Sequence, residues 1–284
     1  MPYAKPDALV STDWLARHLA APDVRVVDGT YIIPPTTRDA HEEFLERHIP
    51  GAVFFDIDDI ADSDSELPHM LPAPEKFSSK VRKLGLGDGN RIVVYDTHGM
   101  VSAARAWWMF RVFGHQDVAV LDGGLPKWLK EGRPVEDGPP RPRERHFTAR
   151  VDRTLVRDLD QVRGNLAARR EQVIDARSAG RFKGVDAEPR AGLRGGHMPG
   201  ALNVPYTNLL DPASKTFLPA EKLSEAFRSA GVDLKKPVAT SCGSGVTACV
   251  LALGLYLLGR DDVAVYDGSW TEWGGRADTP VETG

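Results

Sequence analysis

The sequence predicts an α/β protein of two tandem domains, each a doubly wound, mainly parallel sheet with helices on both faces. Short apolar segments alternate with longer helical patterns along the chain, which is typical of parallel strands joined by helical crossovers. The same motifs also recur in the same order about 150 residues further along. The chain is therefore interpreted as a duplication.

Three motifs carry this internal repeat, and their spacing is nearly constant. They are a His-x-Pro-Gly-Ala turn, an apolar strand that ends in Asp, and an Asp-Val-Ala-Val strand that leads into Asp-Gly. The same motifs in the same order indicate tandem domains. Their first copies occupy 48–52, 26–28 and 117–123, and their second copies occupy 197–201, 173–175 and 262–268.

Each copy is predicted to contain the same elements in the same order. A helix precedes the strand that ends in Asp, and then come the turn, a second strand, a helix, a third strand, a loop, a helix and a fourth strand. The apolar run at 248–259 ends in glycine, as a buried helix does. We expect the other elements at 11–19, 26–28, 52–55, 74–84, 91–95 and 118–121, and again at 156–166, 173–175, 201–204, 220–230, 237–241 and 263–266.

A segment rich in proline and charge, residues 138–146, separates the two copies. Such a composition is typical of a linker. The predicted domains are therefore an N-terminal domain at 1–137 and a C-terminal domain at 147–284. Both lengths are ordinary for single domains.

The composition argues against several classes of protein. The chain has 284 residues, of which 42% are hydrophobic and 27% charged, and its formal net charge is -4. A negative balance disfavours a nucleic-acid surface, and no apolar run approaches the length of about 18 residues that a membrane span needs. The start of the chain lacks the pattern of a signal peptide. We expect a cytoplasmic protein that is a monomer or a weak homodimer.

Cys242 follows the third predicted strand of the second copy. Gly243 and Gly245 flank Ser244, and a helix comes next, so the N–H groups of this loop can turn inward as an anion-binding nest. A thiol in such a setting ionises more readily, and the thiolate is the nucleophilic form. We predict that Cys242 is a nucleophile; the alternative is an inert cysteine in a strand-to-helix turn.

The second cysteine, Cys249, is interpreted as a packing residue. It falls inside the following helix, where it is poorly placed for a disulfide with Cys242, and two cysteines are too few for a zinc site. Neither a metal nor a cofactor is expected. In the first copy Asp96 stands in place of the nucleophile, in a loop that is one residue longer, so the N-terminal domain is predicted to be non-catalytic.

Taken together, these motifs resemble the rhodanese superfamily. The resemblance rests on two tandem copies with a cysteine only in the second, at 242–248, on the paired His-x-Pro-Gly-Ala turns, and on the motifs at 122–124 and 267–270. Within the superfamily the chain is similar to 3-mercaptopyruvate sulfurtransferases over nearly its whole length. The resemblance implies tandem rhodanese-like domains and an enzyme that carries sulfur as a persulfide on Cys242.

The resemblance also implies a small-molecule sulfur donor and an acceptor. Relatives that use thiosulfate typically place basic residues directly after the cysteine, whereas Gly243 and Ser244 are neutral. The implied donor is 3-mercaptopyruvate, with release of pyruvate, and the implied acceptor is a thiol, cyanide or a thioredoxin-like protein. Thiosulfate:cyanide sulfurtransfer, the rhodanese reaction, is the alternative within this class.

Several site residues follow from the match to the family's motifs. Arg181 and Arg190 are expected to bind the donor, because guanidinium groups suit a carboxylate and its neighbouring ketone oxygen. Asp58 and His69 are expected to form a Ser-His-Asp relay with Ser244. The loop residues expected to bind the persulfide are Gly243, Gly245, Val246 and Thr247.

The cysteine loop has two alternative interpretations. A cysteine-dependent phosphatase also uses a thiolate in an anion-binding loop, but it needs an arginine at the position where Ala248 stands. A non-catalytic interaction module would keep the fold without the reaction. Asp96 shows that one copy has lost the nucleophile, and an intact loop around Cys242 argues against the same loss in the second.

Overall fold

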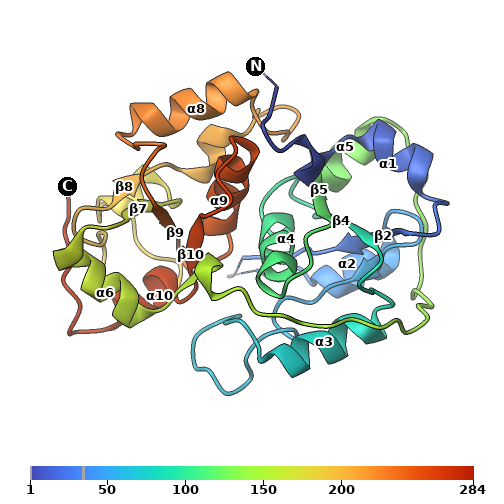
Figure 1. Cartoon of the computed structure of the whole chain (residues 1–284), viewed down its shortest axis with the longest axis horizontal. Coiled ribbons are helices and arrows are strands. Elements are labelled where there is room, and N and C mark those ends of the chain that lie inside the picture. The colour runs from blue at the N-terminus through green and yellow to red at the C-terminus, as the bar shows by residue number, and fades with distance from the viewer. Residues whose placement is uncertain (1, 34–35) are drawn as a thin grey trace. The chain divides into compact units, whose positions relative to one another are not determined.

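The computed structural model describes residues 2–33 and 36–284, which form two compact units with one five-stranded sheet each (Figure 1). The first unit consists of Pro6–Asp152 and the short segment Pro212–Thr216. The second unit consists of Arg153–Asp211 and Phe217–Gly284, together with residues 2–5. None of the helices among these residues combines the length and the apolar character needed to cross a bilayer.

The sheet of the first unit has the strand order β1-β5-β4-β2-β3, and all neighbouring strands are parallel. On one face Leu15, Phe44 and Trp128 pack with alternate strand residues such as Val93. The strands are β1 (Leu9–Val10), β2 (Val24–Asp28), β3 (Val53–Phe54), β4 (Arg91–Tyr95) and β5 (Val118–Leu121). The helices are α1 (Thr12–His18), α2 (Ala40–Glu46) and α5 (Gly124–Lys130) on that face, with α3 (Pro74–Lys83) and α4 (Ala103–Val112) forming the remaining layer.

The second unit repeats this plan with the strand order β6-β10-β9-β7-β8, again parallel throughout. Val162, Phe182 and Trp273 pack on one face of its sheet. The strands are β6 (Val156–Arg157), β7 (Gln172–Asp175), β8 (Leu202–Asn203), β9 (Val238–Ser241) and β10 (Ala264–Tyr266). The helices are α6 (Leu159–Ala168), α7 (Ala179–Phe182), α8 (Ala220–Ser229), α9 (Ala248–Leu257) and α10 (Ser269–Gly275).

The predicted fold class is confirmed, and the duplication appears as two sheets of identical strand order. The buried helix predicted at 248–259 is α9, which ends at Leu257. Gly259 then takes a φ of +96°, a left-handed conformation that favours glycine. Cys249 is fully buried inside this helix, as a packing residue should be.

The predicted helix at 156–166 is wrong at its start. Val156 and Arg157 form strand β6, which pairs with β10 at the edge of the sheet. The helix begins only at Leu159, because Asp158 and Gln161 form a capping box that fixes its first turn. The short strand β1 and the helix α2 were not predicted at all.

The structure also moves the predicted boundary at 138–146. The chain stays with the first unit as far as Asp152, whose N–H donates to the carbonyl of Val112 at 2.7 Å. Phe147 is buried and packs edge-on against Phe77, with ring centroids 5.7 Å apart. A proline-rich composition resembles a flexible linker, but one buried aromatic residue fixes this segment on the domain before it.

The beginning of the chain packs with the second unit. The N–H of Ala4 donates to the carbonyl of Leu257 at the end of α9, at 2.8 Å. The hydroxyl of Tyr3 donates to the carbonyl of Leu218, also at 2.8 Å. Residues 2–5 are therefore grouped with that unit and not with the domain they precede in sequence.

Candidate active site

Cys242 lies at the carboxyl end of β9, between the neighbouring strands β10 and β7. Ligands bind at this end of the strands in open parallel sheets. The thiol residue is only 2% exposed. Its carbonyl accepts from the N–H of Trp270 at 3.0 Å, and the carbonyl of Gly243 accepts from the N–H of Thr271 at 2.8 Å. The loop is thereby fixed to the start of α10.

The remaining loop residues are held from the α9 side. Gly245 has a φ of +80°, so the predicted need for glycine applies at this position. Its carbonyl accepts from the thiol of Cys249 at 3.2 Å. Ser244, Val246 and Thr247 are all buried. Both cysteines are free thiols.

The matching loop of the first unit folds around the carboxylate of its own Asp96. Asp96 occupies the position of Cys242 and is fully buried. Its carboxylate accepts from five backbone N–H groups, two at Oδ1 and three at Oδ2. These donors are His98 at 2.9 Å, Gly99 at 2.6 Å, and Val101, Ser102 and Ala103 at 2.8 Å each. A loop of this type between a parallel strand and a helix can therefore hold a negative charge without a basic side chain.

Ser269 is a site residue that the sequence analysis missed. Its hydroxyl accepts from the N–H of Cys242 at 3.2 Å and donates to the carbonyl of Tyr266 at 2.8 Å. It has a φ of +48°, in the left-handed region that is unfavourable for serine. The first unit places Gly124 at this position, with a φ of +54°. The sequence could have pointed to Ser269, because a serine replaces the glycine of the first copy at this position of the repeat.

Arg181 lies in the short helix α7, whose N-cap is Ser178. Its guanidinium donates to both carboxylate oxygens of Glu188, with the shortest contact at 2.5 Å. The group also lies against the cysteine loop, because a Cβ at Gly243 would be 3.0 Å from Arg181 Nη2. The predicted substrate arginine is thus next to the loop of the predicted nucleophile. Arg190 is half-buried on the same connection.

Arg177 anchors this connection to the sheet. It is 2% exposed, and it donates to both carboxylate oxygens of Asp175, to Glu188 at 2.7 Å and to the carbonyl of Gly196 at 2.8 Å. Its guanidinium also lies 4.2 Å from the ring centroid of Trp270. Burial alone would lower the pKa of Arg177, but the charges of Asp175 and Glu188 raise it above its ordinary value.

The structure brings Asp58 and His69 together in the first unit. His69 Nδ1 lies 3.2 Å from Asp58 Oδ1, and the imidazole is buried. The backbone of His69 has a φ of +43°, an unusual value that often marks a functional position. Its carbonyl accepts from the buried guanidinium of Arg105 at 2.6 Å. Ser244 belongs to the second unit, so the complete relay stays a prediction.

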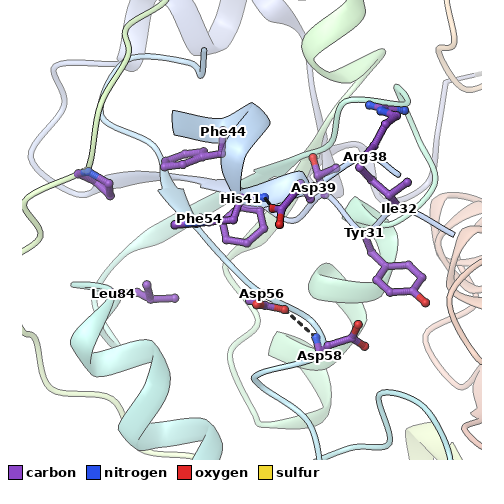
Figure 2. Close-up of a pocket in the computed structure, with 13 residues that line it drawn as sticks. Tyr31, Ile32, Arg38, Asp39, His41, Phe44, Phe54, Asp56, Asp58 and Leu84 are labelled. Carbon is purple, nitrogen blue, oxygen red and sulfur yellow. Dashed lines mark hydrogen bonds between the residues drawn. The ribbon is translucent and has the colours of Figure 1, made fainter. Parts of the chain in front are cut away.

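A cavity of about 600 Å³ in the first unit has Asp58 of this pair in its lining (Figure 2). Asp58 and Tyr31 line it, together with Phe44 and Phe54. Tyr31 also contacts His69 edge-on, with ring centroids 5.0 Å apart. Asp58 is 62% exposed, so its carboxylate joins the buried imidazole to solvent. Over the described part of the chain, no three His, Cys, Asp or Glu side chains are grouped as metal ligands.

Comparisons with known proteins agree with this architecture. A rhodanese-like domain model matches the chain twice, at residues 11–131 and 158–276. A human 3-mercaptopyruvate sulfurtransferase is 45% identical over 276 residues, which cover 95% of this chain and 93% of the relative. A bovine thiosulfate sulfurtransferase is 46% identical over 283 residues, covering 97% of this chain and 94% of the relative.

A solved structure is similar over almost the same span. SseA from Escherichia coli, described as a 3-mercaptopyruvate sulfotransferase with the rhodanese fold, is 40% identical and superposes with a TM-score of 0.85. The similarity covers 93% of this chain and 98% of that one. Overall identity does not separate the two sulfur donors named among the relatives, so the donor has to be argued from the site.

Proposed function

The chain belongs to the rhodanese family, whose domain it contains twice, and we propose that it is a sulfurtransferase acting on 3-mercaptopyruvate through a persulfide on Cys242. The observation that carries the proposal is the pair of matching loops. The copy with Asp96 holds an anion on five backbone N–H groups. The copy with Cys242 offers the same strand-to-helix position to a sulfur nucleophile, with the Arg181 guanidinium next to it.

The first half-reaction transfers one sulfur atom to the enzyme. The Cys242 thiolate attacks the thiol sulfur of 3-mercaptopyruvate, a sulfur–sulfur bond forms, and the carbon–sulfur bond breaks. The electron pair of that bond stays with the carbon skeleton as the enolate of pyruvate. The proton of the substrate thiol moves to this carbon, which leaves pyruvate and an anionic persulfide. Backbone N–H groups from Gly243 to Thr247 would stabilise the persulfide.

The two arginines are assigned to the donor's oxygens. Arg181 and Arg190 would bind the carboxylate and the ketone, and their charge would stabilise the enolate oxygen as it forms. The position of Arg181 supports this role, because its guanidinium lies beside Gly243.

Proton transfer is assigned to the relay of Asp58, His69 and Ser244. When His69 donates from Nδ1 to Asp58, its Nε2 becomes the proton acceptor. The 3.2 Å contact between His69 and Asp58 supports this tautomer. The relay would remove the thiol proton and return it to the leaving carbon.

The second half-reaction passes the outer sulfur to an acceptor and restores the Cys242 thiolate. A thiol, cyanide or a thioredoxin-like protein would attack that sulfur, which gives ping-pong kinetics. A cytoplasmic location stays a prediction, since one relative is named as mitochondrial. The monomeric or weakly dimeric state also stays a prediction.

Mass spectrometry of the intact protein tests the proposal directly. The protein is mixed with 3-mercaptopyruvate in the absence of an acceptor, and a gain of one sulfur atom on Cys242 is expected. Cys242→Ser should gain none, whereas Cys249→Ala should gain the same single atom, since Cys249 is fully buried in α9. Turnover by wild-type protein that never carries the extra sulfur would contradict the scheme.

Thiosulfate is the second candidate donor, and the 46% identity to a bovine thiosulfate sulfurtransferase favours it. The neutral residues Gly243 and Ser244 favour 3-mercaptopyruvate, because a dianion would be better bound by basic residues in the loop. Steady-state rates with both donors decide between them. A higher kcat/KM for thiosulfate would reverse the assignment of the donor. If neither donor forms the persulfide, the sulfurtransferase proposal fails and the alternative of a non-catalytic interaction module is favoured.

A further inference from the structure

Glu188 is an acidic residue in a site that must bind an anionic donor. Its carboxylate lies between two guanidinium groups and is only 2% exposed. One oxygen accepts from Arg177 Nη1 at 2.7 Å, and the other accepts from Arg181 Nη2 at 2.5 Å. Arg181 Nε adds two longer contacts, at 3.2 Å each. A carboxylate held by several guanidinium N–H groups has a fixed position.

The two arginines that share Glu188 have different surroundings. Arg177 is fully engaged by Asp175, Gly196 and the ring of Trp270. Arg181 keeps 24% of its side chain exposed and lies against Gly243. Glu188 therefore connects a fixed guanidinium to the one that faces the cysteine loop.

Charge balance gives Glu188 a second effect. Asp175 and Glu188 together neutralise Arg177 and Arg181, so this buried group has no net charge. Replacing Glu188 by a neutral residue would leave one uncompensated positive charge beside the loop. A dianionic donor would gain more from that charge than a monoanionic donor, because the attraction scales with the product of the charges.

We infer that Glu188 is a positioning residue that fixes the Arg181 guanidinium against the cysteine loop, and that its charge makes the site select a monoanionic carboxylate donor over a dianionic one. This inference rests on the proposed function and adds a determinant of donor choice to it. The neutral loop residues and the Glu188 carboxylate then act in the same direction, since both disfavour a second negative charge on the donor.

The test is the donor preference of Glu188→Gln. Gln keeps one oxygen as an acceptor and removes the charge. We expect its KM for thiosulfate to fall by about tenfold, and its KM for 3-mercaptopyruvate to rise severalfold with a smaller change in kcat. A merely structural role would weaken the use of both donors, so opposite shifts for the two donors are the diagnostic result.

Two further variants control for folding and for the substitution itself. Glu171→Gln makes the same change at another carboxylate of the second unit, one that binds Arg157 through both oxygens outside the site. It should leave both KM values unchanged. Glu188→Asp keeps the charge, so it should keep the donor ranking even if a shorter side chain lowers kcat. If Glu188→Asp changes the preference between the two donors as much as Glu188→Gln does, the charge of Glu188 does not determine that preference.

The wild-type protein separates a failure of the inference from a failure of the function. If mass spectrometry finds no added sulfur on Cys242 with either donor, the proposed function and this inference both fall. If Cys242 accepts sulfur but folded Glu188→Gln keeps the wild-type donor ratio, only the inference falls. Opposite shifts of the two KM values support it.

Discussion

Ser269 has a positive φ and also makes side-chain hydrogen bonds, which Gly124, its counterpart in the first unit, cannot make. Both residues have a positive φ at the start of a helix, and glycine is the residue that this conformation favours. The second unit nevertheless has serine there, and the hydroxyl bonds to the N–H of Cys242. The unfavourable backbone is thus retained where a hydrogen bond to the N–H of Cys242 compensates for it.

This arrangement predicts an order of stability for two variants. Ser269→Ala keeps the unfavourable φ and loses the hydrogen bond, so it should lower the free energy of unfolding by about 2 kcal/mol. Ser269→Gly loses the same bond but relieves the backbone, and it should be about 1 kcal/mol more stable than Ser269→Ala. Urea unfolding measures both values. A Ser269→Ala variant as stable as the wild type would show that the bond contributes nothing.

The residues of the site differ in how far the sequence alone predicts them. Cys242 and its flanking glycines could be found, because a strand-glycine-helix pattern has a chemical meaning on its own. Glu188 could not, since an acidic residue on a polar connection is normally solvated. Its role depends on the burial of Arg177 beneath it, which is a tertiary contact and leaves no periodic mark in the sequence.

At the scale of elements, the loop between β4 and α4 is stabilised by one side chain. Asp96 accepts five backbone N–H bonds there. The loop between β9 and α9 has Cys242 at this position, and the N–H groups of Trp270 and Thr271 of α10 donate to the carbonyls of Cys242 and Gly243. The loop of the first unit is therefore organised around the buried carboxylate of Asp96, whereas Cys242 takes that position in the second unit.

We expect Asp96→Asn to destabilise the first unit strongly. The amide NH₂ group cannot accept, so at least two buried N–H donors would lose their partner, and the free energy of unfolding should fall by about 3 kcal/mol. Asp39→Asn is the matched control, because Asp39 caps α2 through Oδ1 alone and Asn caps helices equally well. Denaturant unfolding that ranks the two variants equally would contradict this role of Asp96.

Most elements could be predicted because the repeat gave each pattern a second, independent copy. The strands β4 and β5 were placed with their observed ends. The two-residue strands β1 and β6 could not be found, because no turn motif marks them as the His-x-Pro-Gly-Ala turn marks the equally short β3 and β8. Their strand character comes from pairing with β5 and β10.

At the scale of the whole molecule, the buried aspartates that end β2 and β7 have different partners in the two units. In the second unit Asp175 is paired with Arg177. In the first unit Asp28 has Thr30 at the corresponding place, with a hydroxyl contact of 2.5 Å. Burial raises the pKa of Asp28 to about 6, the charge of Asp96 adds to the shift, and the hydrogen bonds from Thr30 oppose it. The first unit therefore contains a buried acid whose pKa is raised to about 6.

This difference predicts a pH dependence of stability. The folded state holds the Asp28 proton more tightly than the unfolded chain, so the contribution is greatest below the ordinary pKa of 3.8 and is lost as pH rises towards about 6. The loss amounts to about 3 kcal/mol. Asp28→Asn cannot titrate, so its stability relative to wild type should increase from pH 4 to pH 7. Urea unfolding across this range would refute the assignment if the difference stayed constant.

A single cut cannot separate the chain into its two units, because residues 2–5 belong to the second unit. Tyr3 and Ala4 donate hydrogen bonds to carbonyls of Leu218 and Leu257 in the second unit, although the whole first sheet lies between them in sequence. A fragment beginning at Arg153 would leave behind a backbone partner for the end of α9. The two duplicated halves are therefore not interchangeable, because a segment that precedes the first sheet in sequence completes the packing of the second unit.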